Sequence, residues 1–129
     1  MAGILIIYDD RRIRRLLVRI LTGVGHKVHE AEDGRKGLML LQQIKPSLVI
    51  TDIFMPEVEG LETIRTIRNE APDTPIVAIS GEGNLTYLRA AKGFGAFAAL
   101  EKPFEVDELL RVVSDLLKTG GRRSEGTST

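Results

Sequence analysis

The sequence predicts a doubly wound α/β fold, with one parallel five-stranded sheet covered by five helices. Short runs of β-branched residues alternate five times with longer segments of helical periodicity along the 129 residues. Several of the short runs are almost continuously apolar, which is typical of parallel strands that are covered on both faces. The connections are short, and right-handed crossovers place helices on both faces of such a sheet.

The strands are expected at five short segments along the chain. They are Ile4–Tyr8, Lys27–Ala31, Ser47–Thr51, Ile76–Ser80 and Phe97–Leu100. The first, third and fourth are the runs with the most continuous apolar character. These three strands are therefore expected to be parallel and covered by helices on both faces.

The first expected helix carries an apolar stripe with helical spacing. Its members are Ile13, Leu16, Leu17, Ile20, Leu21 and Val24. Arginines occupy the rest of its surface, at Arg11, Arg12, Arg14, Arg15 and Arg19. Gly23 and Gly25 then end the helix.

The other helices follow the remaining strands. A second begins after the cap-like Asp33 and stops before Pro46, and a third ends before Pro72. The fourth, around Leu85–Lys92, is short and weakly periodic. The fifth has a clear stripe that consists of Val106, Leu109, Leu110, Val113, Leu116 and Leu117.

Composition excludes several classes of function. The 18 basic and 18 acidic residues give a formal charge of zero, which argues against a nucleic-acid surface or a polybasic membrane anchor. The absence of Cys excludes disulfide scaffolds, thiolate metal sites and cysteine nucleophiles. The apolar run before Tyr8 is too short for a signal peptide, and no segment reaches the length of a membrane span. A cytoplasmic location and contact with protein or small-molecule partners are expected.

Reactive side chains gather where the expected strands end. The first strand ends in Tyr8-Asp9-Asp10, the third is followed by Asp52, the fourth ends in Ser80, and Lys102 follows the fifth. Ligands of doubly wound folds bind at the carboxyl ends of the strands. Carboxylates there suit Mg²⁺, and hydroxyl and ammonium groups suit phosphoryl oxygens. No nucleotide-binding glycine motif is present.

Four motifs in order make the sequence resemble the response-regulator receiver domains of two-component signalling, over essentially its whole length. They are the apolar run that leads into an acidic cluster, Asp52-Ile53-Phe54-Met55-Pro56 with Gly60, Ser80-Gly81, and Lys102-Pro103-Phe104. The resemblance implies a flavodoxin-like sheet with strand order 2-1-3-4-5. It also implies a single receiver of the chemotaxis type over residues 1–121. The polar, Ser/Thr-rich residues 122–129 are expected to form a disordered tail.

The resemblance also implies a role for individual residues. Asp52 is the expected phosphoacceptor, a carboxylate nucleophile that forms an acyl phosphate. Asp52, Asp9 and the backbone carbonyl of Phe54 are the expected Mg²⁺ ligands. Ser80 is the switch hydroxyl and Lys102 pairs with the phosphoryl oxygens. The implied partners are a histidine kinase or phosphotransfer protein and a downstream protein on the face made by the fourth helix, fifth strand and fifth helix.

Three other polar residues, one beside the expected site and two away from it, are expected to have no part in the chemistry. Asp10 lies one step beyond the family's two acidic positions, so we expect it to cap or flank the first helix. His26 and His29 flank a strand away from the expected site, so we expect them at the surface rather than as phosphate carriers.

Two residues depart from the family pattern. Tyr8 stands where the family usually carries an acid, and its phenol is neutral at pH 7. The loss of a carboxylate is expected to lower Mg²⁺ affinity by on the order of ten- to a hundredfold. Ala99 stands where many members carry the aromatic ring that moves during activation, so the aromatic half of the switch is absent.

The sequence leaves three functions open. The first is phosphoryl acceptance on Asp52, which would make the domain catalytic only in its own Mg²⁺-dependent phosphorylation and hydrolysis. The second is a degenerate receiver that binds protein without phosphorylation, which Tyr8 and Ala99 favour. The third, a Mg²⁺-dependent phosphohydrolase with its own substrate, lacks chain length for a cap or insertion that would enclose that substrate.

Overall fold

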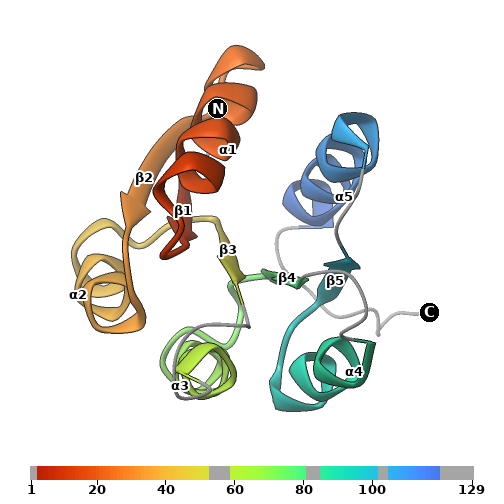
Figure 1. Ribbon diagram of the computed structural model, residues 1–129. Helices are drawn as coiled ribbons and strands as arrows, with labels where there is room; N and C mark the ends of the chain where they lie inside the picture. Colours follow the sequence, from red (N-terminus) through yellow and green to blue (C-terminus); the bar gives the residue numbers. More distant parts are fainter. Residues whose placement is uncertain (1–2, 53–58, 81–84, 102–104, 120–129) are drawn as a thin grey trace.

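The computed structural model describes residues 3–52, 59–80, 85–101 and 105–119. Within these ranges five parallel strands form one sheet in the order β2-β1-β3-β4-β5, as expected (Figure 1). The strands are β1 (Gly3–Ile7), β2 (Lys27–Ala31), β3 (Leu48–Asp52), β4 (Ile76–Ser80) and β5 (Ala98–Glu101). The helices are α1 (Arg11–Gly23), α2 (Gly34–Ile44), α3 (Glu59–Glu70), α4 (Leu85–Phe94) and α5 (Val106–Thr119).

Predicted and observed strand limits agree for β2 and β4 and differ by one residue for the other three. β1 begins one residue early because Gly3 pairs with Lys27, and it ends at Ile7 rather than Tyr8. β3 begins after Ser47 and includes Asp52, which pairs with Ile79 of β4. The limits depend on hydrogen-bonding partners in neighbouring strands, which hydrophobic periodicity does not report.

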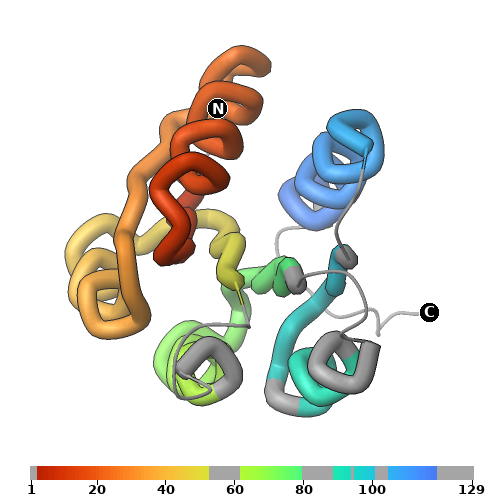
Figure 2. Tube along the Cα trace, in the orientation of Figure 1, coloured from red at the N-terminus to blue at the C-terminus, as the bar shows by residue number. Residues whose placement is uncertain are grey.

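The helices form two layers around the sheet (Figure 1). α1 and α5 cover one face, and α2, α3 and α4 cover the other. The Cα trace shows how the chain first moves from β1 out to the edge strand β2 and then returns past β1 through β3 to β5 (Figure 2). The reversal between β1 and β3 is the position where ligands bind in this class of fold.

Each layer has its own hydrophobic cluster, and the strand residues alternate between the two. Ile4 and Ile6 face α1 and α5, whereas Leu5 and Ile7 face the opposite layer. The α1/α5 cluster consists of Ile4, Ile6, Tyr8, Leu17, Leu21, Leu48, Ile50, Val77, Ile79, Leu100, Leu109 and Val113. This alternation follows from the two-residue period of a strand, so even-numbered residues of β1 and β3 share a face.

Local chain geometry confirms both predicted helix starts. Asp10 is the N-cap of α1, and its carboxylate accepts hydrogen bonds from the backbone N–H groups of Arg12 and Ile13 at 2.9 and 3.3 Å. Asp33 caps α2 and accepts from the N–H of Lys36 at 2.8 Å. α1 ends before Gly25, which has a φ of +99° that an L side chain rarely adopts.

The predicted apolar stripe of α1 is wider than the surface that the helix buries. Leu17 and Leu21 are buried, but Leu16 is 52% exposed and Val24 is 54% exposed. Leu16 lies about 100° around the helix from Leu17, so both cannot face the sheet squarely. Leu16 and Val24 therefore belong to the predicted apolar stripe but not to the surface that α1 buries.

The described residues end with α5 at Thr119. The predicted tail at 122–129 lies outside the described residues. None of the helices in the described ranges combines the length and the apolar character needed to cross a membrane.

Candidate functional site

The carboxyl ends of β1 and β3 bring Tyr8 and Asp52 to the same edge of the sheet. Ile7 pairs with Thr51, so Tyr8 and Asp52 are the next positions of these adjacent parallel strands. Asp52 is the last residue of β3 and is only 6% exposed. Both positions continue the alternation that faces α1 and α5, and neighbouring strands lie about 4.8 Å apart. The predicted phosphoacceptor, Asp52, therefore lies beside Tyr8, the residue that departs from the family pattern.

The neighbouring strands add two further positions to this edge. β4 ends at Ser80, one residue beyond Ile79, which pairs with Asp52. Glu101 pairs with Ser80 at the end of β5. Phe54 and Lys102, which were expected to contribute a carbonyl and an ammonium group, lie outside the described residues.

Tyr8 is fully buried, and its ring belongs to the α1/α5 cluster. Its backbone N–H donates to the carbonyl of Ala31 at 3.0 Å. Burial raises the pKa of the Tyr8 phenol above its ordinary value of 10, and the nearby carboxylates of Asp52, Asp10 and Asp9 raise it further. The phenol is therefore neutral at pH 7, and the ring occupies the core instead of adding a charge to the rim.

Arg14 holds the backbone beside Tyr8, a role that sequence reasoning did not identify. Its Nη1 donates to the carbonyl of Tyr8 at 2.7 Å, and its Nε donates to Glu30 Oε1 at 2.8 Å in an ion pair. The guanidinium thus connects α1, the end of β1 and β2. Sequence reasoning missed this role because Arg14 is one of five arginines between residues 11 and 19, and its position three residues before Leu17 was the available signal.

Asp9 and Asp10 have different roles. Asp10 caps α1, as predicted, and is therefore committed to backbone N–H groups. Asp9 is exposed and follows β1 directly. Among the described residues, no group of three or more His, Cys, Asp or Glu side chains could hold a metal ion. Asp9 and Asp52, which follow and end the adjacent strands β1 and β3, are the carboxylates that the sequence predicted as metal ligands.

Ala99 occupies the middle of β5, where it pairs with Ala78. It is partly buried and packs against the cluster on the α2/α3/α4 side. Phe97 lies two residues earlier, and the guanidinium of Arg68 in α3 is 5.0 Å from its ring centroid. This cation–π contact places the ring on the α3 side of the sheet, near the start of β5 rather than its carboxyl end.

The two histidines are less exposed than expected. Both His26 and His29 are partly buried, and neither lies at the carboxyl end of β2, which is Ala31. His26 precedes β2 and His29 lies at its centre, so neither is at the reactive edge, as predicted. Their expected position at the surface was only partly right, because His29 pairs with Leu5 on the α2/α3/α4 side of the sheet and the backbone N–H of His26 donates to the carbonyl of Leu21 in α1.

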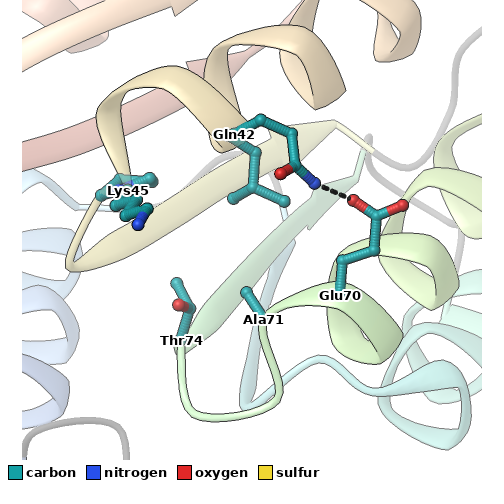
Figure 3. Close-up of a pocket in the computed structure, with 7 residues that line it drawn as sticks. Gln42, Lys45, Glu70, Ala71 and Thr74 are labelled. Atoms are coloured by element: carbon teal, nitrogen blue, oxygen red, sulfur yellow. Dashed lines mark hydrogen bonds between the residues drawn. The ribbon is translucent and has the colours of Figure 1, made fainter.

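A concavity lies at the opposite end of the sheet from Asp52, between the ends of α2 and α3 (Figure 3). Its volume is about 270 Å³, and its lining includes Leu41, Lys45 and Thr74. The side-chain amide of Gln42 donates to Glu70 Oε1 at 2.6 Å and connects the two helices across it. Of the predicted site residues that the structure describes, none lines this concavity.

Comparison with known proteins gives a consistent result. Residues 4–114 match the family described as the response regulator receiver domain. The response regulator MprA of Mycolicibacterium vanbaalenii is 36% identical over 115 residues, which are 89% of this chain and 50% of that protein. MprA of Mycobacterium avium is 34% identical over the same share. The chain therefore spans about half the length of these curated relatives.

Solved structures show the same similarity in three dimensions. The receiver domain of NtrX from Brucella abortus has a TM-score of 0.86 and 35% identity, and the match covers 90% of this chain and 98% of that domain. A putative response regulator from Chloroflexus aurantiacus also has a TM-score of 0.86, with 28% identity over 91% of this chain and 98% of that chain.

Proposed function

The chain belongs to the response regulator receiver domain family, and we propose on this premise that Asp52 accepts a phosphoryl group. The donor is the phosphohistidine of a histidine kinase or phosphotransfer protein. The N–P bond of the donor breaks, an O–P bond forms on the Asp52 carboxylate, and the imidazole returns to its neutral form by taking a proton. The product is an acyl phosphate.

The position of Asp52 is the observation that carries this proposal. The carboxylate is the last residue of a central strand, nearly buried, at the edge where strand order reverses. A nucleophile in such a position loses part of its hydration yet remains at the edge where ligands bind in this fold class. Ser80, at the end of the next strand, and Lys102 would bind the phosphoryl oxygens.

The donor chemistry at this edge fits Mg²⁺. Asp9 and Asp52 provide the hard carboxylate oxygens that this cation prefers, and the carbonyl of Phe54 would add a third protein oxygen. When bound, Mg²⁺ neutralises negative charge on the acceptor and the phosphoryl group. Receiver domains bind the ion in this acidic pocket with the help of a second acid, and here that position holds the buried phenol of Tyr8. We therefore expect weakened Mg²⁺ affinity.

Phosphorylation would be transmitted through Ser80 to the face made by α4, β5 and α5, which would bind a downstream protein. Ala99 offers no ring to move inward, so this transmission depends on Ser80 and the connection into α4. Membership of the family places the domain among signalling receivers rather than conventional enzymes. Its catalysis would be confined to its own Mg²⁺-dependent phosphorylation and hydrolysis.

The surroundings of the domain are also part of the proposal. A cytoplasmic site of action agrees with a phosphohistidine donor and with the lack of Cys. The net charge of zero supports a domain that contacts proteins rather than nucleic acid. These statements concern this domain and not the remaining half of the longer relatives.

Intact-mass measurement after incubation with a small-molecule phosphodonor and Mg²⁺ tests the proposal. The expected result is a gain of one phosphoryl group that requires Mg²⁺ and is absent in Asp52→Asn. A wild-type chain that gains nothing even at high Mg²⁺ would refute it and favour the phosphorylation-independent alternative, which the comparisons do not support. Tyr8→Asp is the companion variant, and it should lower the Mg²⁺ concentration needed for half-maximal phosphorylation about ten- to a hundredfold.

A further inference from the structure

Asp9 is an exposed residue in a short connection that is held on both sides. Tyr8, before it, donates its backbone N–H to the carbonyl of Ala31 in β2 at 3.0 Å. Asp10, after it, caps α1, and its carbonyl accepts from the backbone N–H of Arg14 at 2.9 Å. Asp9 itself belongs to neither β1 nor α1. The direction of its side chain therefore depends on how its two neighbours are fixed.

Arg14 fixes the peptide group that joins Tyr8 to Asp9. Tyr8 is the first residue after β1, and β2 ends at Ala31, which pairs with Ile7. At this point Arg14 Nη1 donates to the Tyr8 carbonyl at 2.7 Å. Because a peptide group is planar, the direction of this carbonyl also sets the direction of the Asp9 N–H. The bond thus sets the backbone orientation from which the Asp9 carboxylate extends.

Glu30 in β2 orients the guanidinium that makes this bond. Arg14 Nε donates to Glu30 Oε1 at 2.8 Å, and the two side chains are 13% and 34% exposed. A guanidinium is a rigid planar fork, so bonds from two of its nitrogens fix its plane. Solvent and salt screen a partly buried pair less than an exposed pair. Through Arg14, the register of β1 on β2 and the position of α1 together fix the Tyr8 carbonyl.

Precise placement of Asp9 matters because Tyr8 adds no charge to the expected metal site. The family's second acid would lie at Tyr8, whose phenol is buried and has a pKa raised above its ordinary value. Mg²⁺ requires near-ideal octahedral geometry, so a site with fewer carboxylates depends more on the placement of those that remain. We propose that Arg14, oriented by Glu30, is a positioning residue that aligns the Asp9 carboxylate for Mg²⁺. This role rests on the proposed function, in which Asp9 is a ligand of the ion.

Two simpler roles for Arg14 predict different results. If Arg14 acted only through its charge, its loss would tighten Mg²⁺ binding, because a positive group repels the ion. If the ion pair with Glu30 served only the stability of the fold, its loss would lower the melting temperature and leave the Mg²⁺ affinity of the folded chain unchanged. A positioning role predicts weaker binding, so the sign of the change in affinity separates the three.

A Mg²⁺ titration of the full chain, followed by ¹H–¹⁵N NMR, tests the role of Arg14. Arg14→Met removes the donors and the charge but keeps an unbranched apolar stem. It should lower the Mg²⁺ affinity about tenfold, a loss typical of residues that orient metal ligands. The matched control, Arg19→Met, removes the same charge from an exposed side chain later in α1 and should leave the affinity unchanged or slightly raised. Circular dichroism melts verify that each variant is folded at the temperature of the titration.

A pair of variants at Glu30 repeats the test without changing Arg14. Glu30→Gln and Glu30→Met both remove the negative charge, but only Glu30→Gln keeps an oxygen that can accept from Arg14 Nε. Glu30→Gln should therefore bind Mg²⁺ several-fold more tightly than Glu30→Met. This pair decides between the three roles if Arg14→Met does not fold.

The metal-free chain provides a second readout. In the wild type the Asp9 amide should be as ordered as the amides of β1 by ¹⁵N relaxation. In Arg14→Met the order parameter of the Asp9 amide should fall while those of β1 stay high. This measurement requires neither the ion nor phosphoryl transfer.

Three outcomes would overturn the proposal. They are a Mg²⁺ affinity of Arg14→Met equal to or above that of the wild type, equal affinities of the two Glu30 variants, and an unchanged order parameter at Asp9. A wild type that binds no Mg²⁺ would overturn it together with the Mg²⁺-dependent acceptor function. A wild type that binds Mg²⁺ with the expected losses in the variants, but gains no phosphoryl group, would support the role of Arg14 and refute the acceptor function alone.

Discussion

α1 and α5 cover the same face of the sheet but carry opposite patterns of surface charge (Figure 1). Both bury an apolar stripe in one cluster, through Leu17 and Leu21 in α1 and through Leu109 and Val113 in α5. α5 has Asp107 and Glu108 in its first turn and Lys118 in its last, which complements the helix dipole. α1 has arginines in its first turn and no acid there.

The difference shows that burial and surface charge serve separate purposes in this domain. The apolar stripe places each helix on the sheet, and this requirement is the same for both. Surface charge contributes far less to the free energy of unfolding, so it can be unfavourable locally without loss of the fold. In α5 the charges assist the helix, whereas in α1 they oppose the helix dipole.

Truncation of a buried leucine should have the largest effect on the free energy of unfolding, and the loss should be similar for α1 and α5. Leu21→Ala and Leu109→Ala remove fully buried side chains, so each should lower the free energy of unfolding by about 2–5 kcal/mol. Urea unfolding measures this loss. Leu16→Ala is the control, and its effect should stay within about 0.5 kcal/mol because Leu16 is exposed. A loss below about 1 kcal/mol at either buried leucine would contradict the view that both helices depend equally on their buried stripes.

Tyr8, in the cluster that α1 and α5 share, should make the fold sensitive to alkaline pH. Its folded pKa is raised by burial above the unfolded value of 10, so its contribution to stability is complete below pH 10. Above pH 10 the unfolded phenol ionises first, and about 1.4 kcal/mol of stability is lost per pH unit until the folded phenol also ionises. Urea unfolding of wild type and Tyr8→Phe between pH 9 and pH 11, about the unfolded pKa, measures the difference.

A direct titration complements that measurement. In Tyr87→Phe, Tyr8 is the remaining tyrosine of the two in the sequence. Its absorbance change should be absent near pH 10 and should appear only with unfolding. Normal ionisation of Tyr8 in the folded state would contradict its burial among the residues of the α1/α5 cluster.

Removal of the α1 cap should have an intermediate effect. Asp10→Ala deletes the acceptor for the N–H groups of Arg12 and Ile13, so it should cost about 1 kcal/mol of unfolding free energy. Asp10→Asn keeps a capping oxygen and should cost only a few tenths of a kcal/mol. Thermal melts of the pair distinguish capping from charge. Equal losses in both variants would show that the charge of Asp10, rather than its cap, supports α1.

Exchange of surface charges should have the smallest effect on the free energy of unfolding. The sign of this effect directly tests the difference in charge between the first turns of α1 and α5. Arg11→Glu with Arg12→Glu should stabilise the fold by about 0.3–1 kcal/mol, because acids then occupy the first turn of α1. Asp107→Lys with Glu108→Lys should destabilise it by a similar amount. Both effects should shrink in high salt. Changes of the same sign in the two helices would contradict the difference proposed here.

Hydrophobic periodicity and the residues that begin and end helices predicted the architecture closely. The alternation of apolar runs with helical stripes identified every described strand and helix, and Asp10 and Asp33 were recognised as caps. The observed limits of β1, β3 and β5 differ from the predicted limits by one residue, because a strand ends where its neighbour stops pairing with it. The stripe of α1 was read too widely because periodicity does not reveal how much of a helix the sheet can cover, as Leu16 shows.

Sequence alone determined the fold class and predicted the edge of the sheet at which Asp52 lies, because these follow from local pattern and from motif order. Only the tertiary structure decided that Tyr8 is buried beside Asp52, and that Arg14 connects Tyr8 to Glu30. It also decided that four of the arginines in α1 face outward without described acidic partners. These features depend on contacts between residues distant in the chain, and one-dimensional periodicity carries no information about such contacts.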